Sequence, residues 1–129
     1  MRFNKINISD EIKKALNELS FIETTDIQKE AIPFLLNSKQ DLIALAQTGT
    51  GKTAAFGVPI INNIKSKYNY TQCIILCPTR ELCIQIKNDI AIFAKYTNTK
   101  INAVYGGTDI KSQIQSLSKG NQIIIGTPG

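Results

Sequence analysis

The chain has 129 residues, of which 43% are hydrophobic and 19% charged, and it contains three cysteines and no histidine. This length allows one domain with its own core. The lack of histidine excludes histidine-based acid–base catalysis and leaves a zinc site short of ligands. The net charge of +5 fits a polyanionic partner. A lysine-rich composition accounts for that charge equally well.

The sequence has no recognisable targeting segment. Residues 1–14 contain Asp10 and Glu11 and no apolar core, so they do not resemble a signal peptide. The apolar runs elsewhere are far shorter than the roughly 20 residues that a membrane-spanning helix needs. The cysteines, clustered within residues 73–83, are typical of reduced thiols in a cytosolic protein. We therefore expect a monomeric cytoplasmic protein without a membrane partner.

Two helices are predicted before the first strand. One begins after Ser9, whose hydroxyl can cap it, with Asp10 and Glu11 well placed in the first turn. The other covers about residues 25–36 and must accommodate Pro33, so a bend is expected there.

Four short apolar runs then alternate with stretches of helical spacing, which cover about residues 82–93 and 110–117. A further helix, containing Pro59, follows the first run. The alternation predicts an α/β fold in which a parallel sheet is covered by helices on both faces. The runs predicted as buried strands are Leu42–Ala46, Cys73–Cys77, Ile101–Tyr105 and Ile123–Ile125.

The segment that joins the first predicted strand to its helix has the features of a phosphate-binding loop. Gly49 and Gly51 allow successive N–H groups to point inward, and the helix N-terminus adds its dipole. We expect Lys52 to reach the β- and γ-phosphates of ATP and Thr53 to bind Mg²⁺, both with catalytic roles. A plain turn rich in Gly and Thr is the alternative. The predicted nucleotide-binding residues here are Ala46, Gln47, Thr48, Gly49, Thr50, Gly51, Lys52 and Thr53.

Gln28 lies upstream of this loop and has two possible roles. Its amide can pair with both N6 and N7 of adenine, whereas guanine would leave buried polar atoms unpaired. The spacing from Thr25 to Gln28 also fits a helix capping box. Taken alone, these residues favour the capping role.

Arg80 follows the second predicted strand and is one of two arginines among 15 basic residues. Its planar guanidinium suits phosphate, as do the Thr79 hydroxyl and the N–H groups at a helix start. The alternative is a surface ion pair with Glu81 or Asp89, which would contribute little.

The same segments, in order along the chain, resemble the DEAD-box RNA helicase family. Residues 20–28 resemble its Q motif, although Ser20, Thr24 and Asp26 replace the usual Gly, Pro and Pro. The matching Q-motif residues are Phe21, Thr25, Ile27 and Gln28, and Phe3 lies where the family has an isolated aromatic that stacks on adenine. Residues 78–82 resemble the PTREL motif, Gly106-Gly107 the GG element, and residues 127–129 the start of TPGR.

The resemblance implies a RecA-like P-loop NTPase, with residues 1–38 as a Q-motif region and residues 39–129 carrying the other elements. It implies adenine contacts from Phe3, Phe21, Thr25 and Gln28. It implies sequence-independent contacts to one RNA strand from Pro78, Thr79, Arg80, Gly106, Gly107, Thr127, Pro128 and Gly129.

The family's Asp-Glu-Ala-Asp strand follows TPGR, so we expect this chain to be truncated before it. The carboxylates that complete an ATPase site are then missing, and the chain should bind nucleotide weakly without hydrolysing it. Two alternatives remain: a P-loop ATPase that acts on DNA, and a standalone module that binds nucleotide or RNA.

Overall fold

The computed structural model describes residues 1–47, 51–107 and 109–128. Strands pair in the order β1-β3-β2 to form one parallel sheet with β3 at its centre. The elements in chain order are η1 (Phe3–Lys5), α1 (Asp10–Glu18), α2 (Asp26–Asn37), α3 (Lys52–Asn63), β1 (Cys73–Leu76), α4 (Arg80–Phe93), β2 (Ile101–Val104), α5 (Ile110–Ser118) and β3 (Ile123–Gly126).

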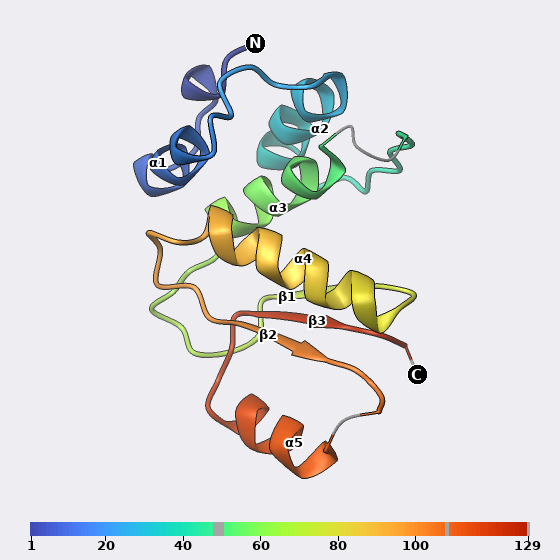
Figure 1. Cartoon of the computed structure of the whole chain (residues 1–129). Helices are drawn as coiled ribbons and strands as arrows, with labels where there is room; N and C mark the ends of the chain where they lie inside the picture. Colours follow the sequence, from blue (N-terminus) through green and yellow to red (C-terminus); the bar gives the residue numbers. More distant parts are fainter. Residues whose placement is uncertain (48–50, 108, 129) are drawn as a thin grey trace.

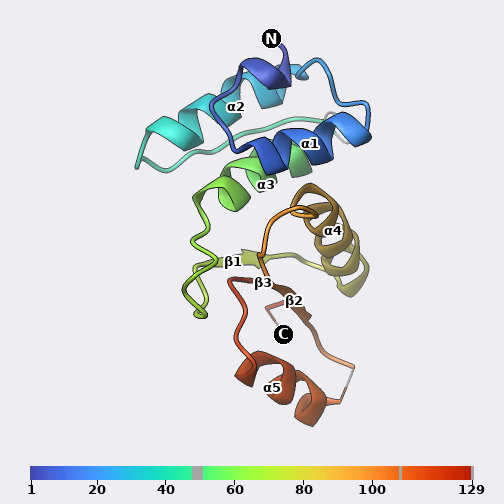
Figure 2. The same cartoon turned by 90° about the vertical axis from the view of Figure 1, so that its left-hand side faces the viewer.

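The elements are stacked in layers on either side of the sheet. Figure 1 shows α4 lying along one face of the sheet and α5 beyond the other. In Figure 2, α3 lies beyond α4, followed by α1 and α2, and α3 packs against both α2 and α4. A parallel sheet between helices confirms the predicted α/β class. None of the helices in the described part of the chain is long and apolar enough to cross a membrane.

The structure confirms the predicted start of the first helix and the predicted positions of two prolines inside helices. Ser9 caps α1, because its hydroxyl accepts a hydrogen bond from the Ile12 N–H at 3.4 Å. Pro33 lies within α2 and Pro59 within α3. Each helix therefore continues past its proline with one fewer backbone hydrogen bond.

One strand prediction was wrong. Leu42–Ala46 is not part of the sheet, and its side chains Ile43 and Leu45 are 90% and 91% exposed. A strand needs a neighbour to pair with its backbone N–H and C=O groups. The strands in the described ranges pair only with one another, so apolar composition alone does not give this segment a strand structure.

The core lies on the α4 side of the sheet. Ile123 and Ile125 of β3 are fully buried there, together with the inner face of α4. On the other face β1 is open, because its residues Ile74 and Leu76 are 66% and 69% exposed. The edge strand β1 is therefore buried on one face only, which corrects its prediction as a buried strand. The apolar side chains predicted to form a stripe along α5 are also largely exposed to solvent.

The end of α1 determines how the chain enters the functional region. The Ser20 N–H donates to the Asn17 carbonyl at 3.0 Å, and the Phe21 N–H donates to the Leu16 carbonyl at 2.9 Å. These two bonds form a Schellman motif, in which the residue after the helix cap adopts a left-handed conformation. Ser20 has that conformation, with φ of 60°. Ser20 occupies the position where the Q motif usually has Gly.

We expect Ser20→Gly to raise the free energy of unfolding by about 0.5–1 kcal/mol. Glycine removes the strain of a left-handed residue, which outweighs its greater freedom in the unfolded chain. Urea unfolding measures the change. The same substitution at Ser38, where φ is −126°, should lower stability, because no strain is relieved there. An unchanged or lower stability of Ser20→Gly would show that the motif is not strained.

Candidate functional site

The predicted phosphate loop leads into the N-terminus of α3. Gly51 is the residue that caps α3, with φ of 83°, and Lys52 and Thr53 form its first turn. Lys52 is exposed to solvent. Of the other predicted loop residues, Ala46 and Gln47 are described, whereas Thr48, Gly49 and Thr50 lie outside the described residues. The described end of the loop thus has the helix dipole and free cation that an anion site requires.

Gln28 connects this loop to α2. Its Oε1 accepts a hydrogen bond from the Thr25 N–H at 2.9 Å, and its own N–H lies 3.5 Å from the Thr25 hydroxyl. These bonds confirm the predicted capping box. The other end of the amide, Nε2, donates to the Gly51 carbonyl at 3.2 Å. The side chain, only 2% exposed, thereby ties the start of α2 to the start of α3. Its role toward adenine stays a prediction.

The two predicted aromatic residues differ in accessibility. Phe3 is 3% exposed and packs against Phe21, with ring centroids 6.2 Å apart and planes at 26°. Phe21 is 38% exposed and also contacts Phe93. Phe21, Lys52 and Thr53 line the same cavity of about 670 Å³, which lies next to α3 and α4. The fold therefore brings the Q-motif aromatic and the phosphate-loop lysine to one cavity, with Phe21 as the accessible ring.

The described residues near this cavity supply few ligands for a metal ion. Thr53 offers one hydroxyl to the cavity, and burial raises the pKa of Asp89, which also lines it. Within the described ranges, no group of three or more His, Cys, Asp or Glu side chains is arranged to hold a metal. Magnesium prefers six oxygen ligands in octahedral geometry. These side chains do not fit a complete magnesium site by themselves.

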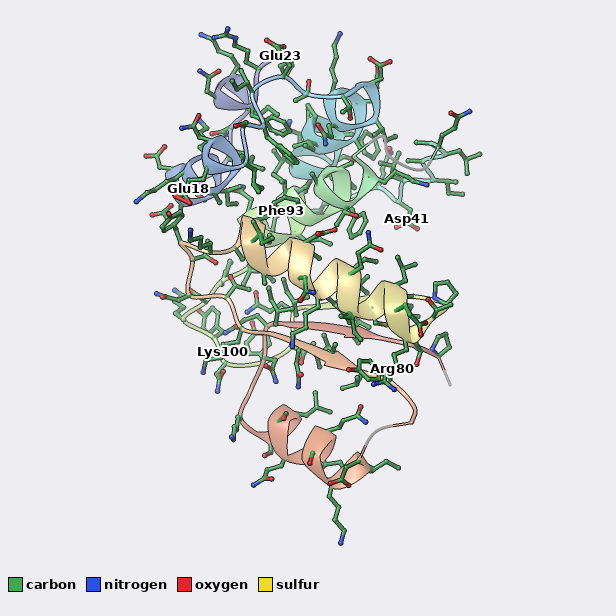
Figure 3. All side chains as sticks on the ribbon, viewed as in Figure 1. Glu18, Glu23, Asp41, Arg80, Phe93 and Lys100 are labelled. Carbon is green, nitrogen blue, oxygen red and sulfur yellow. The ribbon has the colours of Figure 1, made fainter. Side chains whose placement is uncertain are left out.

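Three segments that follow strands meet at one edge of the sheet. Because the strands are parallel, their carboxyl ends lie together. The pairing extends past the strands, since the Cys77 N–H donates to the Gly126 carbonyl at 2.9 Å and the Thr127 N–H to the Val104 carbonyl at 3.2 Å. We name residues 77–80, 105–107 and 127–128 the carboxyl edge. Figure 3 places Arg80 there, at the opposite end of the sheet from Lys100.

The carboxyl edge thus unites the residues that the sequence predicts for RNA contact. Gly129 lies outside the described residues. Thr79 caps α4, with its hydroxyl accepting from the Leu82 N–H at 3.2 Å, which leaves the hydroxyl hydrogen available. The other residues, all exposed or partly exposed, are Pro78, Arg80, Gly106, Gly107, Thr127 and Pro128.

Among the described residues, Arg80 forms no ion pair with an acidic side chain. In the described part of the chain, ion pairs join Glu23 to the N-terminus and to Arg2, and Glu18 to Lys95. The alternative ion pair of Arg80 with Glu81 or Asp89 is therefore not formed. The guanidinium carbon of Arg80 instead lies 4.9 Å from the centroid of the Tyr105 ring.

Sequence reasoning missed two residues that support the carboxyl edge, one within it and one on α5. Tyr105 supports Arg80, and the Gln113 side chain binds the backbone of Tyr105 through two hydrogen bonds, each of 3.0 Å. The position of Tyr105 directly before the glycine pair was a usable signal. Gln113 gave no such signal, because a single Gln within an amphipathic helix is common and does not indicate a function.

The three cysteines are free thiols that are largely shielded from solvent. Cys77 and Cys83 are buried, Cys73 is half-buried, and all three thiols are free. Burial raises the pKa of Cys77 to about 11, so this thiol stays protonated at neutral pH.

Comparisons with known proteins show the family to which the chain belongs. Residues 25–129 match the family model described as DEAD/DEAH box helicase. The chain is 47% identical to an ATP-dependent RNA helicase CshA of Listeria monocytogenes over 99% of its own length and 24% of that protein. It is 44% identical to the DEAD-box ATP-dependent RNA helicase CshA of Bacillus subtilis, of which it covers 26%. It thus spans about a quarter of these relatives.

A solved structure is also similar over the whole chain. The crystal structure of a DEAD box protein from the hyperthermophile Methanococcus jannaschii superposes with a TM-score of 0.95 at 43% sequence identity. The match covers all of this chain and 35% of the other.

We expect Gly51→Ala to lower the free energy of unfolding by about 1–2 kcal/mol, because alanine is strained in the left-handed conformation. An added Cβ would also lie 2.2 Å from Gln28 Nε2. Urea unfolding tests this. Gly106→Ala is the control, because nothing lies within 4 Å of a Cβ there. Adding Gln28→Ala to Gly51→Ala should remove the clash but not the strain. Equal stabilities of the two glycine variants would contradict the prediction.

Proposed function

The chain belongs to the DEAD/DEAH box helicase family, and on this basis we propose that it is the ATP-binding part of an ATP-dependent RNA helicase. The observation that carries the proposal is the hydrogen bond from Gln28 to the Gly51 carbonyl. It links the candidate base-recognition residue directly to the phosphate loop. Remodelling of RNA duplexes driven by ATP hydrolysis is a proposal for the whole protein, since the relatives named RNA helicases are about four times longer.

The nucleotide would lie at the start of α3. Lys52 supplies the cation for the phosphates, and the helix N-terminus supplies oriented N–H groups. Thr53 would contribute a hydroxyl to Mg²⁺, with the nucleotide phosphates supplying other oxygens. When bound, this ion neutralises phosphate charge. Phe21 offers its exposed ring at the same cavity, and Gln28 binds both Thr25 and the Gly51 carbonyl through its side-chain amide.

The RNA would lie along the carboxyl edge. Arg80 and Thr79 offer donors at the start of α4, and Gly106 and Gly107 allow the strand to approach the backbone closely. These groups recognise phosphate and sugar, so binding should not depend on base sequence. The two interfaces are formed by different segments of one chain. Nucleotide at α3 and RNA at the carboxyl edge could therefore be held together.

We expect Gln28→Ala to reduce the preference for ADP over GDP by about tenfold, which corresponds to the loss of about 1.4 kcal/mol of hydrogen bonding. Titration with fluorescent ADP and GDP analogues measures the ratio. The matched control is Gln72→Ala, which removes an amide bonded to the backbone of Lys65, distant from the phosphate loop. An unchanged ratio would leave Gln28 with the capping role alone.

We expect Arg80→Ala to weaken binding to oligo(U) and to reduce the slope of log affinity against log salt by about 0.7, the value for one phosphate contact on a single strand. Fluorescence anisotropy at several salt concentrations measures both. The chain's other arginine, Arg2, pairs with Glu23 near the N-terminus, so Arg2→Ala should leave the slope unchanged. Equal effects of the two substitutions would indicate unspecific charge attraction. Tighter binding of oligo(dT) than of oligo(U) would favour a DNA-acting ATPase instead.

A further inference from the structure

Arg80, the proposed phosphate ligand, is a long side chain that needs to be positioned. It is the first residue of α4, it is exposed, and it has no carboxylate partner within the described ranges. A long side chain of this kind loses considerable rotamer freedom when it binds. An arginine already held in place loses less, so it binds the same phosphate more tightly.

The guanidinium of Arg80 lies over the ring of Tyr105. The guanidinium carbon lies 4.9 Å from the ring centroid, within the range of a cation–π contact. This contact needs no carboxylate, and no ion pair within the described ranges engages the five N–H donors of the guanidinium. The contact with Tyr105 therefore restricts where the Arg80 side chain can point, while its N–H donors stay available to a phosphate. A carboxylate partner would restrict it equally but would occupy the donors.

Gln113 in turn holds Tyr105. Strand β2 ends at Val104, so the ladder of the sheet does not fix the backbone of Tyr105. The amide of Gln113 takes the place of a neighbouring strand: its Oε1 accepts from the Tyr105 N–H and its Nε2 donates to the Tyr105 carbonyl, both at 3.0 Å.

This pair of bonds also attaches α5 to the carboxyl edge. Ile110 and Ile114 of α5 are 69% and 61% exposed, and no described residue of the helix is buried. Apolar packing alone thus contributes little to the position of α5. Gln113 and Tyr105 both line a cavity of about 310 Å³ between this helix and β2, together with Gly106 and Thr127.

We propose that Tyr105 and Gln113 are positioning residues that hold the Arg80 guanidinium toward the phosphate of an RNA strand at the carboxyl edge. The inference rests on the proposed RNA-binding function and adds two residues to it. Gly107 fits this arrangement, because a Cβ on it would lie 3.8 Å from Arg80 Nη1 and its φ is 82°. The backbone at Gly107 and the guanidinium fork therefore flank the same space.

The test is the affinity of this chain for fluorescent oligo(U), measured by anisotropy at low salt. Tyr105→Leu should weaken binding about two- to fivefold, the range for an exposed cation–π contact. Tyr105→Phe, which keeps the aromatic ring, should bind oligo(U) with the affinity of the wild type. In the Arg80→Ala background, Tyr105→Leu should cause no further loss, because the tyrosine acts through the arginine. Tyr70→Leu, at an exposed tyrosine outside the carboxyl edge, is the matched control.

A second pair of variants keeps the test valid if Tyr105→Leu does not fold. Arg80→Lys changes only an exposed side chain, and lysine keeps the charge but lacks the planar group that stacks. It should bind oligo(U) about two- to fivefold more weakly than the wild type. Gln113→Glu should weaken binding similarly, because it places an oxygen against the Tyr105 carbonyl. Wild-type affinity of Arg80→Lys or of Gln113→Glu would overturn the inference.

A measurement without RNA separates this inference from the proposed function. The Tyr105 ring should shift the NMR signal of the Arg80 Nε–H upfield, and the shift should disappear in Tyr105→Leu and persist in Tyr105→Phe. If the wild type binds oligo(U) and Tyr105→Leu binds equally well, the inference alone fails. If the wild type does not bind oligo(U), the proposed function fails and the positioning role with it, even if the NMR shift is present.

Discussion

The parallel pairing of β3 with β1 on one side and β2 on the other determines where the candidate RNA residues lie. The three strands are separated in sequence by helices α4 and α5, yet parallel alignment brings their carboxyl ends to one edge. The hydrogen bonds of Cys77 and Thr127 continue the alignment beyond the strands. If β3 shifted by one residue, its inward and outward side chains would exchange faces, and the fully buried Ile123 and Ile125 would leave the core.

A second constraint lies in the helical layers, where the side-chain amide of Gln28 makes several hydrogen bonds. Gln28 completes the capping box of α2 and also binds the carbonyl of Gly51, the residue that caps α3. The Gln28 amide is polar and only 2% exposed, so it would be costly to leave unpaired. The same contact excludes any side chain at Gly51. A ligand that recruited the Gln28 amide would have to compete with these bonds, which couples nucleotide recognition to the geometry of the phosphate loop.

The two proposed interfaces offer different kinds of cation. At α3, Lys52 is a flexible point charge beside oriented N–H groups, which suits phosphates that the backbone itself surrounds. At the carboxyl edge, Arg80 is a planar cation on an aromatic ring, which suits a phosphate approached from one side. The proposed role thus gives a physical reason for an arginine at position 80 in a chain whose other basic residues are nearly all lysines.

The sequence by itself determined the local features. The caps at Ser9, Thr25 and Thr79, the helices and three of the four predicted strands follow from hydrogen-bonding groups and apolar periods within a few residues of one another. Tertiary structure decided whatever needs a partner distant in sequence. Leu42–Ala46 has the composition of a strand but no neighbour to pair with in the described residues. Tyr105, Gln113 and Arg80 became one group only when the parallel sheet brought their segments together, because stacking and hydrogen bonding depend on distance in space and not along the chain.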